Sequence, residues 1–150
     1  MTLDQTDWQI LTALQHNARQ PFAVLGQQVG LSGPAVTERV RKLEAAGIIS
    51  RYTIAMDLTA LGASIQGFVQ LTTSPQAYPQ VHRLVSETPE FLECHHLTGS
   101  ASFLIRLATC SLPQLEELIQ ALSVYGQTQT SLVLSTPVSA KIITAEVTAR

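Results

Sequence analysis

The sequence has little charge, few aromatic residues and almost no cysteine. Only 13% of its 150 residues are charged, 5% are aromatic, and two are cysteines, Cys94 and Cys110. So few cysteines exclude a disulfide-rich scaffold and suit a reducing cytoplasm. Eleven acidic and nine basic side chains give a net charge of −2. No overall positive field therefore points to a nucleic-acid partner.

Long apolar runs are absent as well. No stretch of the sequence approaches the roughly 20 residues that span a bilayer, and the first residues lack the basic and apolar regions of a signal peptide. We therefore expect neither a membrane protein nor a secreted one. With 45% hydrophobic residues, the chain can still form the core of one ordinary domain or two small ones.

The first part of the chain has the periodicity of helices. Asp4 is placed to cap a helix in which Asp7, Ile10 and Leu14 share one face. Directly after two further helical segments, residues 48–54 are β-branched and aromatic, which predicts a strand.

Those two further helices are short and adjacent. One is predicted from Pro21 to Gly30, and the next from Ser32 to Gly47. Gly26 has no side chain to obstruct the crossing of the two helices. This arrangement predicts a helix-turn-helix.

The second part of the chain alternates between strands and helices. Strands are predicted at 65–71, 91–98 and 102–109, helices between Pro75 and Pro89 and from Ser111 to Gly126, and further strand material at 128–138 and 140–147. This βαββαβ order with an extra C-terminal strand is typical of a ferredoxin-like domain. We therefore predict an α+β protein with domains at 1–60 and 61–150.

The apolar strand faces suggest a partner subunit. Phe103, Ile105 and Leu107 lie on one face of a predicted strand. Two short helices do not suffice to cover all such faces, so we expect the excess to be buried against a second copy of the chain.

Cations gather on and just after the predicted third helix. They are Arg39, Arg41, Lys42 and Arg51, within 13 residues. A local patch of this kind can neutralise phosphates, and Ser32 at the start of the helix can offer its N–H and hydroxyl to a phosphate. The alternative is a solvated helix surface, with Glu38 and Glu44 pairing with the neighbouring cations.

Other reactive side chains predict no catalytic or metal site. His95 and His96 are adjacent in a strand and point to opposite faces, so they do not chelate one ion. Cys94 is expected opposite Arg106, out of register with Cys110, which predicts packing thiols rather than a disulfide. The sequence has no nucleophile–base motif and no phosphate loop, so we expect a protein that is not an enzyme.

Several motifs occur together along the chain. In the first half they are Leu3-Asp4-x-x-Asp7-x-x-Ile10-Leu11-x-x-Leu14, Val29-Gly30-Leu31-Ser32 and Glu38-Arg39-Val40-Arg41-Lys42-Leu43-Glu44-x-x-Gly47-Ile48-Ile49-x-x-Tyr52. In the second half they are Glu93-Cys94-His95 and Thr98-Gly99. Over essentially its whole length, the chain resembles the leucine-responsive regulatory protein family (Lrp/AsnC, the feast/famine regulators).

The resemblance implies a winged helix-turn-helix reader joined to a ferredoxin-like (RAM-type) domain for effector binding and oligomerisation. Members are cytoplasmic prokaryotic transcription regulators that bind double-stranded promoter DNA, dimerise and commonly assemble to octamers. A small-molecule effector, usually an amino acid, binds between subunits, and no cofactor or metal is implied. The alternative function is a metabolite-binding assembly module whose helix-turn-helix docks a protein.

The same resemblance assigns two sets of site residues. The DNA-binding set is Ser32, Pro34, Thr37, Glu38, Arg39, Arg41 and Lys42, to which the cation patch adds Arg51. The effector-binding set is Thr98, Gly99, Ser100, Ala101, Ser102, Ser135 and Thr136. One position departs from the family, because Ser102 stands where an aspartate is usual. A serine hydrogen-bonds but brings no charge, which weakens the expectation of an amino-acid ammonium there.

Overall fold

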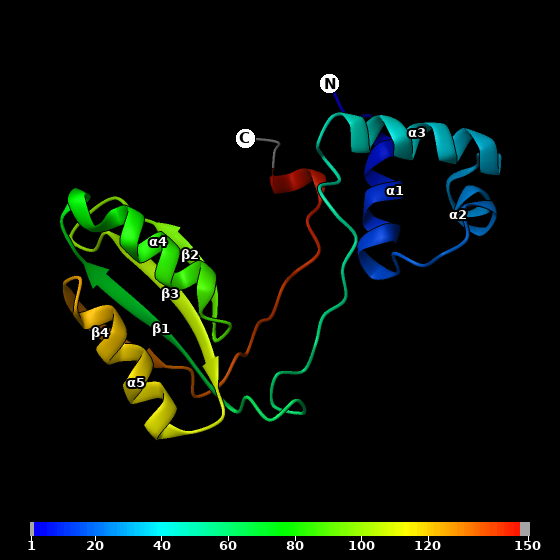
Figure 1. The fold of residues 1–150 in the computed structure, drawn as a ribbon. Helices are drawn as coiled ribbons and strands as arrows, with labels where there is room; N and C mark the ends of the chain where they lie inside the picture. The colour runs from blue at the N-terminus through cyan, green and yellow to red at the C-terminus, as the bar shows by residue number, and fades with distance from the viewer. Residues whose placement is uncertain (1, 148–150) are drawn as a thin grey trace. The chain divides into compact units, whose positions relative to one another are not determined.

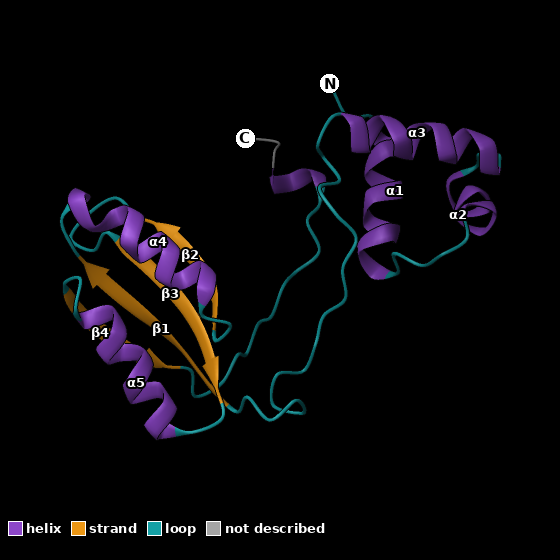
Figure 2. Ribbon diagram, viewed as in Figure 1, coloured by secondary structure: helices purple, strands orange, loops and turns teal. Residues whose placement is uncertain are grey.

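The protein folds as two compact units (Figures 1 and 2), seen in a computed structural model that describes residues 2–147. The first unit ends at Ile54 and takes in the segment from Val138 onward, and the second unit is Ala55–Pro137. The C-terminal segment thus packs with the N-terminal helices, although it follows the sheet in the sequence. Within residues 2–147, every helix is too short or too polar to cross a membrane.

The first unit is built from three helices, α1 (Gln5–His16), α2 (Phe22–Val29) and α3 (Gly33–Ala45). Figure 1 shows the three helices gathered together. Their apolar faces form one core, which consists of Ile10, Leu14, Leu25, Val36, Val40 and Leu43. The turn between α2 and α3 passes through Gly30, whose φ of 70° favours glycine. The predicted helix-turn-helix is confirmed.

The helix ends are capped as the sequence predicts. Asp4 Oδ1 accepts a hydrogen bond from the backbone N–H of Asp7 (2.8 Å), and Asp7 Oδ2 accepts one from the N–H of Asp4 (3.1 Å). Ser32 Oγ accepts a bond from the N–H of Ala35 at the start of α3 (3.4 Å). These side chains satisfy backbone donors that have no partner inside the helix.

The second unit is a sheet with two helices. Its elements are β1 (Ile65–Thr72), a 3₁₀ turn η1 (Pro75–Ala77), α4 (Tyr78–Glu87), β2 (Phe91–His96), β3 (Phe103–Thr109), α5 (Leu112–Ser123) and β4 (Gln127–Leu132). The strands are antiparallel neighbours in the order β2-β3-β1-β4. The predicted βαββαβ ferredoxin-like domain is confirmed.

Both helices of this unit lie over one face of the sheet (Figure 1). Phe103, Ile105 and Leu107 are all 0% exposed within a single chain. The expectation that part of this face needs a second subunit was therefore wrong. Val81 of α4 and the buried leucines of α5 pack against these strand residues, and the ring of His96 in β2 packs against Phe103 as well.

The histidines and cysteines of β2 lie close to their predicted places. His95 Nε2 is 3.2 Å from a Glu93 carboxylate oxygen, whereas the His96 ring packs on the other face, 5.0 Å from the ring of Tyr78. The predicted opposite faces are confirmed. Cys94 pairs with Ile105, one residue from the predicted partner, and this register holds from Glu93 to His96. Both cysteines are free thiols, and burial raises the pKa of Cys94.

Two predicted strands are not formed in the described part of the chain. Residues 48–54 are an extended loop in which Ile54 is 75% exposed. Residues 140–147 are loop followed by a 3₁₀ turn, η2 (Ala145–Val147), and β4 already ends at Leu132. Both segments have strand-like composition, but neither pairs with a strand within residues 2–147. Without a ladder to join, β propensity alone does not make a strand.

Substitutions at two glycines of the helix-turn-helix distinguish a steric requirement for glycine from its low helix propensity. A Cβ on Gly26 would meet the backbone carbonyl of Leu31, which cannot move aside, whereas a Cβ on Gly33 would make an ordinary 3.5 Å contact with Ala23. We expect Gly26→Ala to lower the free energy of unfolding by about 1–3 kcal/mol. Gly33→Ala is the matched control and should leave it unchanged or raise it. Urea unfolding of the two variants measures both, and equal stabilities would contradict the steric reason.

Candidate nucleic-acid interface and effector loop

A hollow of about 550 Å³ lies on the surface that α2 and α3 share. It is lined by Phe22, Ala23, Gly33, Pro34, Thr37, Glu38 and Arg41. Four of these residues belong to the predicted DNA-binding set, and the start of α3 brings them together. Phe22, at the start of α2, was not among the predicted contacts. It packs against the core and borders the hollow as well.

The polar groups at the hollow are only partly engaged within the chain. Lys42 Nζ lies 3.7 Å from Glu38 Oε1, and these side chains are 63% and 60% exposed. An exposed pair of this kind contributes little to stability, so the lysine remains available to another anion. Arg41 is exposed. The Thr37 hydroxyl donates to the carbonyl of Gly33 in the preceding turn (3.0 Å), which leaves its methyl group and one acceptor site for a ligand.

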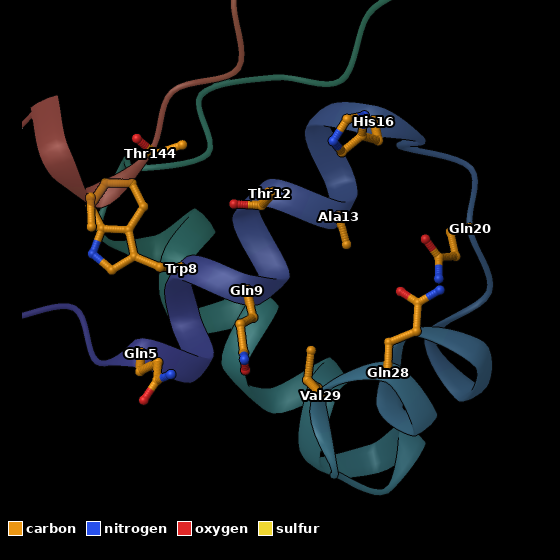
Figure 3. A pocket seen from close by; sticks show the side chains of 11 residues that line it. Gln5, Trp8, Gln9, Thr12, Ala13, His16, Gln20, Gln28, Val29 and Thr144 are labelled. Carbon is orange, nitrogen blue, oxygen red and sulfur yellow. The ribbon is translucent and has the colours of Figure 1, made fainter.

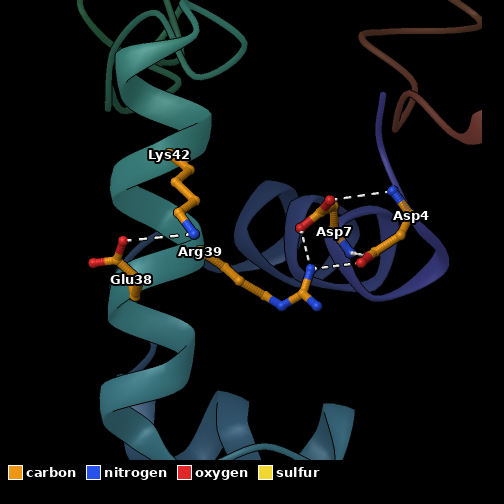
Figure 4. Close-up of polar contacts among 5 residues, drawn as sticks. All are labelled: Asp4, Asp7, Glu38, Arg39 and Lys42. Carbon is orange, nitrogen blue, oxygen red and sulfur yellow. Dashed lines mark hydrogen bonds and ion pairs between the residues drawn. The ribbon is translucent and has the colours of Figure 1, made fainter. Parts of the chain in front are cut away.

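Arg39 leaves α3 in a different direction (Figure 4). Its Nη1 lies 2.7 Å from Asp4 Oδ2 and 2.7 Å from Asp7 Oδ1, at the start of α1. This contact fastens the two helices to each other. We name Asp4, Asp7 and Arg39 the α1–α3 clamp. Because the charge of Arg39 is already neutralised inside the domain, this residue is not one of the contacts that we propose for DNA.

The clamp exists because Asp7 is buried. Asp7 is only 3% exposed. A buried carboxylate is costly unless a cation and hydrogen bonds compensate it. The Asp7 backbone N–H, and after it the Arg39 guanidinium, lower the pKa of Asp4. The two carboxylates in turn raise the pKa of Arg39. The sequence did carry the signal, since Asp7 lies on the apolar face of its predicted helix and thus requires a cation.

Ser32 and Arg51 occupy the two ends of the region. The Ser32 hydroxyl already caps α3. Arg51 is exposed on the extended loop that follows the helix. The next residue fixes this loop, because the Tyr52 hydroxyl donates to Glu44 Oε1 (2.9 Å). Burial, and then the hydrogen bond to Glu44, raises the pKa of Tyr52 to about 12.

The loop between β2 and β3 carries most of the predicted effector set. Thr98, Gly99 and Ser100 are exposed, and Ala101 is buried. Gly99 has a φ of 111°, a backbone conformation that favours glycine. The Thr72 hydroxyl at the end of β1 donates to the carbonyl of Ser100 (3.1 Å). The loop is therefore anchored on β1, with its tip open to solvent.

Ser102 provides the second anchor of this loop. Its hydroxyl donates to the carbonyl of Thr73 (3.0 Å) and accepts from the N–H of Thr73 (3.1 Å). Its backbone N–H donates to the carbonyl of Leu71 (2.9 Å). The serine thus holds the loop in place, and an acidic side chain at this position would lose the donated bond.

Ser135 and Thr136 lie at the other end of β1. The N–H of Val133 donates to the carbonyl of Gln66 at the start of that strand (2.8 Å), whereas the loop is tied to Thr72 at its end. A strand rises about 3.3 Å per residue, so the two parts of the predicted set are roughly 20 Å apart in one chain. A single chain does not bring them together.

Comparison with protein families assigns both units. Residues 3–44 match the AsnC-type helix-turn-helix domain, and residues 66–143 match the Lrp/AsnC ligand binding domain. The transcriptional regulator LrpC of Bacillus subtilis is 34% identical over 135 residues, which cover 90% of this chain and 94% of LrpC. The chain belongs to the Lrp/AsnC family.

Solved structures of other regulators share this fold. LrpC of B. subtilis superposes with a TM-score of 0.88 at 33% identity, covering 94% of this chain and all of that one. The transcriptional regulator NMB0573 of Neisseria meningitidis, solved as an L-Met complex, gives a TM-score of 0.89 at 27% identity, covering 98% and 99%. The protein is thus an Lrp/AsnC transcription regulator with a DNA-binding helix-turn-helix and a ligand-binding domain.

The α1–α3 clamp predicts how this Lrp/AsnC regulator responds to mutation and to acid. Arg39→Ala leaves the buried Asp7 carboxylate without its cation, and we expect it to cost about 1–3 kcal/mol of stability. Arg41→Ala is the matched control, because it removes an exposed side chain from the same helix. It should cost almost no stability. Thermal unfolding at neutral pH compares the two, and equal melting temperatures would contradict a structural role for Arg39.

The clamp also predicts the direction in which stability changes with pH. The pKa of Asp4 is lowered in the folded chain, so its contribution to stability is full above the ordinary pKa of an aspartate. That contribution is lost as the pH falls through the lowered value, because the unfolded chain then binds more protons. Arg39→Ala should make the acid loss shallower than in the natural chain, while Arg41→Ala should not change it.

Proposed function

We propose that this Lrp/AsnC regulator binds promoter DNA through the hollow between α2 and α3. Residues 1–60 form the reading domain in this proposal. The observation that carries it is the hollow itself, where Pro34, Thr37, Glu38 and Arg41 converge from the predicted set. The start of α3 would enter the major groove, as the recognition helix of a helix-turn-helix does.

The contacts proposed for DNA have different roles. Arg41, Lys42 and Arg51 would bind phosphates, because they are exposed cations in a weakly charged chain. Pro34, Thr37 and Glu38 would lie nearest the bases, and Ser32 would offer the helix start to a phosphate. In this proposal the protein acts at DNA in the cytoplasm and carries out no catalysis.

Substitution of two exposed cations on α3 tests the interface. Arg41→Ala with Lys42→Ala should weaken binding to promoter DNA and reduce the slope of log K against log salt by up to about two units. The measurement is a salt titration by fluorescence anisotropy on a labelled genomic promoter fragment. Arg83→Ala is the matched control, since Arg83 is 77% exposed on α4 of the second unit.

An unchanged slope in the double variant would contradict the phosphate contacts. Weak, salt-independent binding of the natural chain would favour instead a helix-turn-helix that docks a protein. Arg83→Ala should reproduce the slope of the natural chain, which excludes a general effect of lost charge.

We propose further that residues 61–150 bind a small-molecule effector, such as an amino acid, between subunits of a homo-oligomer. The separation of the loop at 98–102 from Ser135 and Thr136 supports a shared site, because a second copy can supply the part that one chain holds elsewhere. The relative NMB0573 is an L-Met complex. Ala101 would form a wall of the site, and Ser102 would position the loop.

The oligomer itself is proposed as a dimer that assembles to an octamer. The face of the sheet opposite the helices carries Phe68 and Leu104, both partly exposed. These side chains offer apolar area to a second copy, although most of their neighbours on that face are polar. Closed symmetric assemblies of this kind repeat one self-complementary patch.

Thermal shift with the twenty amino acids tests the effector site. An amino acid at about 100 times its dissociation constant should stabilise the protein by roughly 2.7 kcal/mol. Gly99→Val should abolish the response, because it blocks the loop tip. Gly62→Val is the matched control, since Gly62 also has a positive φ (91°) and open space around it. No response of the natural chain to any amino acid would contradict this class of effector.

A further inference from the structure

The C-terminal segment is bound to α1 by one glutamine. Gln15 Nε2 donates to the carbonyl of Ile143 (2.9 Å), and Gln15 Oε1 accepts from the N–H of Ile143 (2.8 Å). The two residues are 128 positions apart in the sequence. A side-chain amide here satisfies both backbone groups of one residue, as a neighbouring strand would. We call this pair of bonds the Gln15 clasp.

A pocket beside the clasp extends the same contact. It has a volume of about 560 Å³. Its walls come from α1, from Gln20 before α2, from Gln28 and Val29 at the end of α2, and from the C-terminal segment. The lining residues include Trp8, Thr12 and His16 of α1 and Thr144 of the segment (Figure 3). Thr144 directly follows the clasped residue, so the segment forms a wall of the pocket rather than passing it at a distance.

Only a short stretch of chain connects the clasped residue, Ile143, to the sheet unit. The second unit ends at Pro137, and Ile143 follows it six positions later in the sequence. An extended chain covers at most about 20 Å in that number of residues. The first unit therefore has a second covalent connection to the sheet unit, in addition to the one that follows Ile54.

We propose that the outer face of α1 is a docking surface for residues 138–147 of the same chain, with Gln15 recognising the backbone of Ile143. Docking closes a second link between the reading domain and the sheet unit. Recognition depends on backbone groups, so it requires the segment to be extended at Ile143 and does not require a particular side chain there. This inference rests on contacts inside the first unit and does not depend on DNA or effector binding.

The single tryptophan reports the docked state directly. The sequence has only one tryptophan, Trp8, and it shares the pocket with Thr144. In Gln15→Ala we expect redder emission and a larger acrylamide quenching constant than in the natural chain. Gln27→Ala is the matched control, because Gln27 is exposed on α2 and is not among the residues that line the pocket. It should behave as the natural chain does.

Amide hydrogen exchange measures the clasp itself. The N–H of Ile143 should exchange slowly in the natural chain and in Gln27→Ala, and about tenfold faster in Gln15→Ala, since two hydrogen bonds are lost. Ile143→Pro removes the donated N–H and should reproduce the tryptophan change of Gln15→Ala. The double variant should show no further change, because both substitutions remove the same contact.

Several results would overturn the proposal. They are an Ile143 amide that exchanges as fast as in an unfolded peptide in the natural chain, equal quenching in Gln15→Ala and Gln27→Ala, and additive effects in the double variant. Loss of DNA binding in any variant would not bear on it. Circular dichroism melting of each variant confirms that α1 remains folded, so that unfolding is not mistaken for release of the segment.

A mixing experiment separates the chain's own segment from that of a second copy. Gln15→Ala and Ile143→Pro chains are unfolded together and refolded as a mixture. If the segment docks on its own chain, no clasp is restored and tryptophan quenching equals that of the separate variants. If it comes from a second copy, intact Gln15 of one chain meets intact Ile143 of the other, and quenching falls towards the natural value. That fall would overturn the same-chain assignment.

Discussion

The ion pairs of Arg39 with Asp4 and Asp7 fix the helix that reads DNA to the helix that supports it. Without them, the buried Asp7 carboxylate at the start of α1 would keep the hydrogen bond from the Asp4 N–H but would lack a cation. The clamp therefore serves two purposes. It satisfies a charge that the core cannot accept, and it sets where α3 begins its course across α1. The hollow that we propose for DNA depends on that placement.

α1 is held at both ends by different chemistry. At its start, charged side chains bind it to α3. Near its end, Gln15 binds the backbone of Ile143 with neutral hydrogen bonds, which are weaker than charge-assisted ones. The strong contact lies inside the reading domain, and the weak one joins it to a segment that continues into the sheet unit.

Much of the fold follows from local patterns in the sequence, and the errors share one cause. Asp4 and Ser32 cap their helices, and the βαββαβ order is correct, because caps and periodicity act over a few residues. The direction of Arg39, the complete cover of Phe103 and the course of residues 140–147 depend on partners far away in the sequence. The sequence grouped Arg39 with the other cations on α3 but did not place it opposite Asp7. Composition gave residues 140–147 a strand's propensity but no strand to join.

The same distinction explains why the effector site is harder to predict than the DNA interface. Apart from Arg51, the proposed DNA contacts lie on α3 or at its start, so the spacing along one helix brings them together. The effector set combines the loop at 98–102 with Ser135 and Thr136, which the sheet separates by the length of β1. Moreover, the hydroxyl of Ser102 is engaged with Thr73 on both sides. It resembles a structural pin more than a ligand for an ammonium group. In the proposed site, selectivity for an effector would come from the exposed loop tip and from groups that another subunit supplies, because the Ser102 hydroxyl carries no charge and is already engaged with Thr73.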